Sequence, residues 1–396
     1  MTFDAQRLSR IDTHFQRYVD DGRLPGWQIH LEQHGEVVHS SHYGLADIDS
    51  GRPVAEDTLW RIYSMTKPII SVAAMQLWEQ GLFELTDPIS RFIPSFADVQ
   101  VWAGGSNTKA FLVPPTEPIR MWHLLTHTSG LTYGFMQVHP VDAMYRDAGF
   151  EFDFPAGITL EEVCDRFAAL PLRFQPGSAW GYGHSTDVLG RVLEVLTGRS
   201  LEDVVREQVL DPLGMSDTNW YVEGDDLERL ASLYVSPAGS LLRYPPLEHK
   251  SLHRTAPDGG GGMVSTAADY ARFTRMLLGR GALDGVRLLG PRTVDLMTRN
   301  HLPGGKDLGD LNSGGFAETI FEGIGFGLGF GVMMDPSPSK AAASVGDFFW
   351  GGLASTAFWV DLSTGVTASF YTQLMPSSTY PIRAQLRQLI SAALLD

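Results

Sequence analysis

Cysteine is nearly absent from the sequence, with Cys164 the only one among 396 residues. A single thiol excludes an intrachain disulfide and any metal cluster that needs several cysteine ligands. Because structural disulfides are typical of oxidising compartments, this usage favours a reducing environment. We therefore expect a cytoplasmic protein.

Long apolar runs are also missing. No run approaches the ~20 residues that a membrane-spanning helix needs. The segment Met1 to Asp21 has scattered charges rather than the apolar core of a signal peptide, and it predicts a helix that buries Ile11, Phe15 and either Tyr18 or Val19. We therefore expect no contact with a membrane.

Basic residues are outnumbered by acidic ones, 30 Lys and Arg against 46 Asp and Glu, which gives a net charge of −16. This balance disfavours nucleic acid and anionic membranes as partners, and it provides no steering for anionic substrates. With 43% hydrophobic residues, the composition is otherwise that of a globular protein, long enough for one two-lobed unit or two domains. It leaves homo-oligomerisation open.

The sequence does contain the tetrapeptide Ser64-Met65-Thr66-Lys67 at the start of a predicted helix that ends at Gly81. Ser64 would lie at the positive end of the helix dipole, with Lys67 one turn away on the same face. A serine needs a base to attack a carbonyl, and burial can lower the pKa of a lysine from about 10.4 so that it serves as one. Taken alone, S-x-x-K also occurs by chance. The apolar positions of this helix have the spacing of one buried face: Ile70, Ala73, Ala74 and Leu77.

Strand patterns lie near both ends of the chain. Residues 27–39 and 357–371 each predict a hairpin, and residues 325–334 and 348–350 also have strand character. An amphipathic helix is expected from Pro381 to Leu395. We therefore predict an α+β fold in which residues 1–82 and 290–396 together form one antiparallel sheet, flanked by the terminal helices.

The middle of the chain, residues 83–289, predicts a mainly helical lobe inserted between the two parts of the first. Helices are expected from about Thr116 to Gly130, over 186–197 and after the N-cap residues Ser265-Thr266. Residues 301–322 contain many glycines without a sustained period. They predict an irregular loop that could act as a mobile lid.

Two further stretches hold candidate catalytic groups. Tyr182 lies on a predicted turn ahead of a helix, where a nearby Lys67 would lower the pKa of the phenol from about 10 and let the two share a proton. Taken alone, that stretch is explained more simply if Tyr182 is only an aromatic residue of the core.

Gly351 and Gly352 would let a ligand approach the end of a strand, whose N–H groups could bind an oxyanion. Taken alone, this stretch is also explained by a β-bulge beside aromatic residues of the core.

Taken in order, S-x-x-K, Y-x-H and W-G-G resemble the serine β-lactamase and penicillin-binding-protein superfamily, whose members carry S-x-x-K, Y-x-N and K-T-G. The chain looks most like the class C β-lactamases and the family VIII carboxylesterases. Leu124 to Leu131 and Gly261 to Thr266 are also similar to that family, and the resemblance covers nearly the whole chain. It implies a β-lactamase/transpeptidase-like fold with the active site in the cleft between the lobes.

The resemblance also implies roles for individual residues. Ser64 would be the acylated nucleophile, Lys67 its proton partner and Tyr182 the second acid/base. The backbone N–H groups of Ser64 and Leu353 would form the oxyanion hole. His184 replaces the asparagine of relatives, which puts the contact to the acylamide side chain of a β-lactam in doubt.

Trp350 replaces the lysine that relatives use against a substrate carboxylate. An indole has one N–H and no charge, so an anionic β-lactam would lose a charge-assisted hydrogen bond, whereas a neutral ester would lose nothing. We therefore expect a serine esterase for short- to medium-chain acyl esters, with a small neutral ester and water as its substrates and no cofactor. The apolar pocket walls are expected from four aromatic residues: Trp350, Tyr133, Phe135 and Trp180.

Two alternatives stay open. One is a sibling reaction on the same fold, namely acyl transfer to an alcohol or hydrolysis of an amide or β-lactam. The other is a catalytically silent binding protein, which is disfavoured because all three catalytic side chains are present.

Three other motifs have simpler explanations. The stretch around Ser185 nearly matches G-x-S-x-G, but it lacks the last glycine and the preceding parallel strand. His123 and His127 have the i, i+4 spacing of zinc ligands without the glutamate of H-E-x-x-H, so a capping or core role is favoured and no metal site is expected. Gly259 to Gly262 lacks the Lys-Ser/Thr of a phosphate loop and is interpreted as a turn ahead of a helix.

Overall fold

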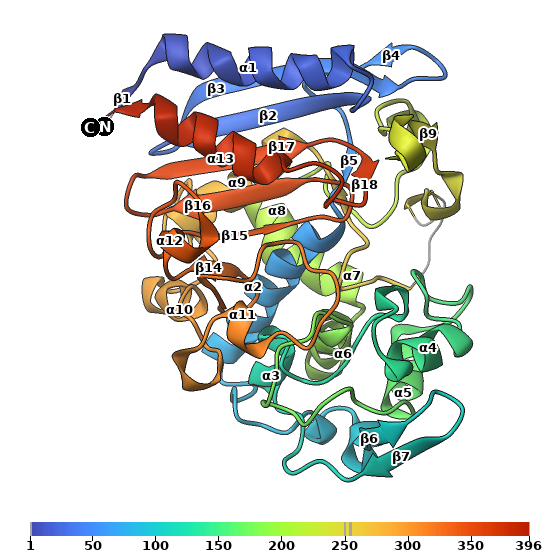
Figure 1. The fold of residues 1–396 in the computed structure, drawn as a ribbon. Coiled ribbons are helices and arrows are strands. Elements are labelled where there is room, and N and C mark those ends of the chain that lie inside the picture. Colours follow the sequence, from blue (N-terminus) through green and yellow to red (C-terminus); the bar gives the residue numbers. More distant parts are fainter. Residues whose placement is uncertain (1, 249–250, 253–255, 396) are drawn as a thin grey trace.

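An eight-stranded antiparallel sheet dominates one lobe of the protein (Figure 1). The computed structural model describes residues 2–248, 251–252 and 256–395. Both ends of the chain contribute to the sheet, because β17 pairs with β2 and places Phe370 opposite Ile29. The predicted α+β fold is confirmed. Across the sheet, the strands are β13 (Ile324–Phe326), β14 (Gly331–Met333), β15 (Phe348–Gly351), β16 (Ala357–Asp361), β17 (Val366–Tyr371), β2 (Gly26–Gln33), β3 (Glu36–Asp47) and β4 (Arg52–Pro53).

The remaining elements are helices and short strands. In chain order, the helices are α1 (Ala5–Asp20), α2 (Thr66–Glu79), α3 (Met121–Leu125), α4 (Pro140–Asp147), α5 (Leu160–Ala168), α6 (Ser185–Thr197), α7 (Leu201–Val205), α8 (Asp211–Leu213), α9 (Ala267–Leu278), α10 (Pro291–Met297), α11 (Leu308–Leu311), α12 (Pro336–Ser339) and α13 (Ile382–Ala393). The short strands are β1 (Thr2–Phe3), β5 (Trp60–Arg61), β6 (Val101–Gly105), β7 (Ala110–Val113), β8 (Tyr234–Val235), β9 (Leu242–Arg243), β10 (Val264–Ser265), β11 (Ala282–Leu283), β12 (Val286–Arg287), β18 (Leu374–Met375) and β19 (Leu394–Leu395). Among the described residues, no helix is long and apolar enough to cross a bilayer.

The terminal helices α1 and α13 cover one face of the sheet, as predicted (Figure 1). Phe15 of α1 packs on Phe370, with the ring centroids 5.0 Å apart. Tyr18 completes the buried face of α1, whereas Val19 is only half-buried. Because β1 pairs with β19, the two ends of the described chain lie side by side.

Helix α9 packs against the opposite face of the sheet and connects it to the turn that carries Ser64. The Thr266 hydroxyl caps α9 by accepting the N–H of Asp269 (3.2 Å), as predicted. Tyr270 packs on Phe358 of β16 and donates its hydroxyl hydrogen to the carbonyl of Met65 (2.9 Å). Although α9 falls within residues 83–289, it therefore packs with the sheet rather than with the helical lobe.

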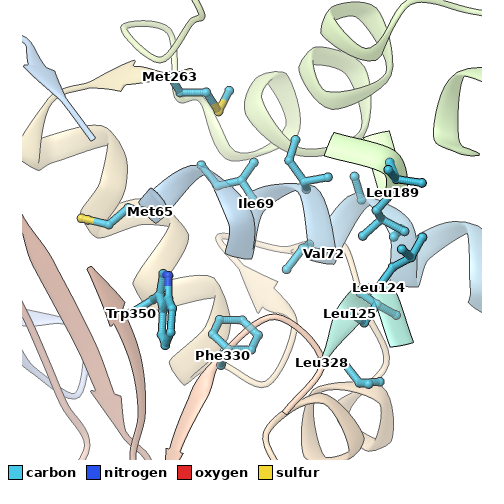
Figure 2. Packing of buried hydrophobic residues seen from close by; sticks show 14 of the residues in the cluster. Met65, Ile69, Val72, Leu124, Leu125, Leu189, Met263, Leu328, Phe330 and Trp350 are labelled. Carbon is cyan, nitrogen blue, oxygen red and sulfur yellow. The ribbon is translucent and has the colours of Figure 1, made fainter. Parts of the chain in front are cut away.

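Helix α2 is buried over most of its length, with apolar side chains of several elements around it (Figure 2). The predicted apolar face is buried, and so are all the remaining residues from Thr66 to Met75. Ile69 and Val72 belong to the same apolar cluster as Leu124 of α3 and Leu189 of α6. A helix packed in this way is fixed in position, so the residues at its start are held rigidly.

Three elements differ from the sequence-based prediction. Helix α3 is only five residues long, because His127 has φ = 56°, which a right-handed helix does not accommodate. The run 325–334, for which only strand character was predicted, contains the paired strands β13 and β14. The hairpin β6–β7 was not predicted, because the exposed Phe111, Leu112 and Val113 break the alternation of apolar and polar residues that marks a half-buried strand.

Residues 301–322 are not wholly irregular, since they include α11 and a 3-10 turn at Pro303–Gly305. The backbone of Trp180 holds this segment on both sides. Its N–H donates to the carbonyl of Leu311 (2.8 Å), and its carbonyl accepts the N–H of Ser313 (2.9 Å). The segment is thereby attached to the loop that carries Tyr182, while its motion as a lid stays a prediction.

Candidate active site

Ser64 lies in a 3-10 turn, Tyr63–Met65, immediately before α2. Tyr63 has φ = 45°, a left-handed conformation that costs about 1–3 kcal/mol for a residue with a side chain. Two hydrogen bonds hold the turn, from the Ile62 N–H to the carbonyl of Met263 (3.0 Å) and from the Tyr270 hydroxyl to the carbonyl of Met65. The turn presents the Ser64 hydroxyl at the positive end of the α2 dipole.

Lys67 contacts Ser64 directly. Its Nζ donates to the Ser64 Oγ at 3.1 Å and also to the carbonyl oxygen of Gly260. The side chain is only 2% exposed, and Nζ lies 4.6 Å from the ring centroid of Tyr182 and 5.5 Å from that of Tyr133. The amine is therefore shielded from water and positioned to exchange a proton with Ser64.

The hydroxyl of Tyr182 reaches Ser64 from the other side. It hydrogen-bonds with the Ser64 side chain and accepts the indole N–H of Trp350 at 3.1 Å. Burial raises the pKa of Tyr182 well above its usual value, and the Glu318 carboxylate raises it further. The expectation of a lowered pKa is thus wrong, because desolvation outweighs any effect of the Lys67 cation. Tyr182 is therefore a protonated phenol at neutral pH.

Trp350 and Trp180 lie behind Tyr182 and do not line the cavity. Each is 1% exposed. Trp180 stacks on the Tyr182 ring with an interplanar angle of 8°, and Trp350 meets the same ring edge-on at 63°. The prediction that these two indoles form pocket walls is corrected: they support the phenol.

An open cavity beside Ser64 encloses about 740 Å³, solvent at its mouth included. Three of the predicted binding residues line it, namely Tyr133, Phe135 and His184. The rings of Tyr133 and Phe135 are stacked at 4.9 Å. Phe135 in turn stacks on Phe152, which makes one wall of the cavity aromatic.

Gly351 and Gly352 do not line the cavity, contrary to the prediction that they admit a ligand. A Cβ at Gly351 would lie 2.3 Å from Nη2 of Arg383, and one at Gly352 would lie 2.3 Å from the carbonyl oxygen of Ile62. The two glycines therefore allow other parts of the protein to approach the backbone closely.

The backbone N–H of Leu353, directly after the two glycines, has no hydrogen-bond acceptor among the described residues. Leu353 lines the cavity together with Ser64. This arrangement is compatible with the predicted oxyanion hole, in which both N–H groups would bind the carbonyl oxygen of a substrate.

The glycine run Gly259 to Gly262 belongs to the site, which the sequence did not indicate. The N–H of Gly260 donates to Oδ1 of Asp187 and to Oδ1 of Asp258, each at 2.7 Å, and its carbonyl accepts from Lys67. A Cβ at Gly260 would lie 3.0 Å from both carboxylate oxygens of Asp187. Gly260 thus positions the lysine, and the run of four glycines was the signal for such a close approach.

His184 stands where the family's Y-x-N pattern has an asparagine. Its Nδ1 pairs with Oδ2 of Asp187 at 2.6 Å. Burial and the neighbouring Asp258 carboxylate raise the pKa of Asp187 well above its usual value. His184 therefore belongs to the network that supports Gly260, and it forms part of the cavity wall.

The alternative motifs have structural explanations. The Ser185 hydroxyl is buried and hydrogen-bonds with the Ser129 hydroxyl at 2.8 Å. Nδ1 of His123 accepts the N–H of Arg120 at the start of α3, and burial lowers the pKa of His123 to about 4. His127 packs against Tyr182 with the ring centroids 5.0 Å apart. Among the described residues, no group of three histidine, cysteine or acidic side chains could hold a metal ion.

Comparison with known proteins identifies the family. A family model described as Beta-lactamase matches residues 11–392, so the chain belongs to the serine β-lactamase and penicillin-binding-protein superfamily. Protein Rv1367c of Mycobacterium tuberculosis is 36% identical over 386 residues, which cover 95% of this chain and 91% of that protein. Esterase EstB of Burkholderia gladioli is 30% identical over 416 residues, covering 99% and 97% of the two chains.

A solved structure gives the same result for the fold. EstCE1, a hydrolase with promiscuous acyltransferase activity, superposes with a TM-score of 0.83 at 28% identity and covers 98% of this chain and 99% of its own. The resemblance inferred from S-x-x-K, Y-x-H and W-G-G is therefore confirmed, and so is the β-lactamase/transpeptidase-like fold.

Proposed function

We propose that the protein is a serine carboxylesterase that hydrolyses small neutral esters with short or medium acyl chains. The observation that carries the proposal is the convergence of the Ser64, Lys67 and Tyr182 side chains at one cavity. The names of the similar esterase EstB and hydrolase EstCE1 support it. We further propose water as the second substrate and the cytoplasm as the compartment.

In the acylation step, the Ser64 oxygen attacks the ester carbonyl carbon while neutral Lys67 takes the hydroxyl proton. The carbonyl oxygen becomes an oxyanion, which the N–H groups of Ser64 and Leu353 stabilise. When the tetrahedral intermediate collapses, Tyr182 gives its proton to the departing alkoxide and regains one from Lys67. The raised pKa of Tyr182 suits this role, since the hydroxyl enters the step protonated.

Deacylation follows the reverse route. A water molecule loses a proton to the Lys67 and Tyr182 pair and attacks the acyl-enzyme carbonyl. The acid then leaves, and the proton returns to the Ser64 oxygen. The net reaction is one ester and one water to one acid and one alcohol, and no cofactor is needed.

The charges around the cavity favour a neutral substrate. Arg61 lines the cavity, but its guanidinium donates to the Ser251 hydroxyl (2.7 Å) and to the carbonyl of Ala231 (2.6 Å). The position of the family's lysine is held by Trp350, whose N–H is used by Tyr182. Trp350 therefore offers a substrate carboxylate no charge, and the hydrogen bonds of Arg61 named here go to protein groups.

A second candidate function is acyl transfer to an alcohol, which the printed activity of EstCE1 favours. An alcohol that replaces water in the second step would yield a new ester. Product analysis with a competing alcohol separates the two reactions, and a nitrocefin assay tests hydrolysis of β-lactams. Turnover of nitrocefin as fast as that of esters would contradict the argument from Trp350.

Covalent labelling tests the proposal. A p-nitrophenyl alkylphosphonate should release one equivalent of p-nitrophenol and leave a phosphonate on the Ser64 oxygen, located by peptide mass spectrometry. The Ser64→Ala variant should remain unlabelled and should not hydrolyse p-nitrophenyl esters. The Ser185→Ala variant, which removes the other serine of a near-motif, should still be labelled. Labelling of wild type at another residue would refute the assignment.

The Trp350→Phe variant should lower kcat/KM for esters by about two- to tenfold, the range expected for loss of one hydrogen bond. The Tyr182 hydroxyl then loses the donor at 3.1 Å and is held less firmly toward Ser64. The smaller ring also leaves a cavity behind Tyr182, which should lower Tm. Hydrolysis of p-nitrophenyl acetate and a thermal melt measure the two effects. Unchanged kcat/KM would show that the indole N–H does not position the phenol.

A further inference from the structure

Glu318 is a buried carboxylate in the cavity wall that the mechanism does not use. It is 2% exposed and lines the same cavity as Ser64. One oxygen, Oε2, accepts hydrogen bonds from the Ser377 hydroxyl (2.9 Å) and from Arg383 (2.7 Å). The other oxygen, Oε1, is buried and has no hydrogen-bond partner among the described residues.

The carboxylate is held rigidly. Nη2 of Arg383 also donates to the carbonyls of Gly352 (3.0 Å) and Thr356 (2.9 Å), so the ion pair is anchored next to the turn that carries Leu353. A buried acceptor without a donor is unfavourable by about 1–3 kcal/mol, and more for a charged group. Such a fixed and unsatisfied oxygen is a place where a ligand can supply the missing hydrogen.

Two further acidic residues belong to the described lining of the cavity. Asp153 and Asp258 line the cavity with Glu318. Its described lining also includes Arg61, which donates to protein groups, and His184, which pairs with Asp187. The Glu318 carboxylate raises the pKa of both Tyr182 and Tyr133, whereas Arg383 lowers that of Tyr182. A carboxylate group on a substrate would meet an acceptor of like charge here.

We propose that Glu318 selects esters that carry a hydrogen-bond donor, such as a hydroxyl group, and rejects esters that carry a carboxylate, by accepting the donor at Oε1. This inference rests on the proposed esterase function and specifies its substrate class. Glu318 acts as a specificity-determining residue and takes no part in the proton relay. The sequence did not indicate it, because it lies in the glycine-rich segment 301–322, which has no sustained pattern.

Two matched series of esters test the proposal. On the alcohol side, p-tolyl acetate, 4-(hydroxymethyl)phenyl acetate and 4-acetoxybenzoate differ only in a methyl, hydroxymethyl or carboxylate group. On the acyl side, the p-nitrophenyl esters of hexanoic, 6-hydroxyhexanoic and adipic acid differ in the same way. In at least one series, wild type should favour the hydroxylated over the methyl ester in kcat/KM, and should disfavour the carboxylate by about tenfold or more.

The Glu318→Gln variant should reduce both preferences by about tenfold, because a neutral amide keeps the size of the side chain and can donate to a carboxylate. Glu322→Gln is the matched control, since Glu322 is an exposed glutamate of the same segment, and its ratios should equal those of wild type. Thermal melts verify folding. If Glu318→Gln does not fold, Glu318→Asp, which withdraws the carboxylate by one methylene, should show the reduced preference for the hydroxylated ester.

The outcomes separate the two proposals. Hydrolysis of esters with the same substrate ratios in wild type and the Glu318 variants would overturn the role of Glu318 and leave the esterase function standing. Failure of wild type to hydrolyse any ester in either series would overturn the esterase function and the inference that rests on it. A ratio that shifts only in the Glu318 variants would support both.

Discussion

Ester hydrolysis should fall by about 10³-fold when Lys67 is replaced by methionine. Methionine retains an unbranched apolar side chain but cannot take the Ser64 proton or donate to the carbonyl of Gly260. The loss should appear in kcat/KM for p-nitrophenyl acetate and in the rate of phosphonate labelling, because both need an activated Ser64.

The fold should survive this substitution. Lys67 is 2% exposed, and replacing a buried polar amine by an apolar group of similar size removes the cost of its desolvation. The Tm of Lys67→Met should therefore equal or exceed that of wild type, which separates loss of chemistry from loss of structure. Lys109→Met, at an exposed position, is the control that should keep full activity. A Lys67→Met protein with more than about a tenth of wild-type kcat/KM would not fit a proton-transfer role.

The elements that the sequence predicted well have strong local patterns. The terminal helix α1 and the hairpin β2–β3 have clear periodicities of apolar residues, and the Thr266 cap marks the start of α9 directly. Ser64 and Lys67 could be predicted to contact each other because they lie on adjacent turns of one helix. The distance of 3.1 Å between Lys67 Nζ and Ser64 Oγ reflects that local geometry.

The cavity wall could be predicted only in part, because it depends on contacts between distant segments. Tyr182 and Trp350 are 168 positions apart, and no local pattern shows that the indole N–H donates to the phenol. The sequence correctly identified Trp350 as a departure from the family but placed it in the pocket rather than behind Tyr182. Burial of Tyr182 likewise reversed the predicted direction of its pKa shift, since desolvation is a property of the packed protein.

The roles of other residues were missed because they depend on contacts between distant segments. The carbonyl of Gly260 accepts a hydrogen bond from Lys67, and the Asp187 carboxylate holds Gly260 through its N–H. Gly260 and Asp187 are 73 positions apart. Glu318 becomes notable only because its Oε1 is buried without a described partner. The chemistry of the candidate site was therefore accessible from the sequence, whereas its electrostatic environment required the three-dimensional arrangement.

Replacement of Tyr182 by phenylalanine should reduce kcat/KM for esters by about 10²- to 10⁴-fold. The ring and its stacking on Trp180 are retained, but the alkoxide leaving group loses its proton donor, and the Trp350 N–H loses its acceptor. Because burial holds the pKa of Tyr182 well above neutral, the loss should be of similar size from about pH 6 to 9. Tyr145→Phe removes a buried tyrosine hydroxyl outside the cavity lining and should have little effect.

The double variant Lys67→Met/Tyr182→Phe gives the sharper test. If the two side chains form one proton relay through Ser64, the second substitution removes a function already lost, and the double variant should be about as active as the weaker single variant. Steady-state kcat/KM for p-nitrophenyl acetate across the four proteins measures this coupling. If the fold-loss in kcat/KM of the double variant equals the product of the two single losses, Lys67 and Tyr182 act independently. The shared relay would then have to be abandoned, and both steps of the proposed mechanism depend on it.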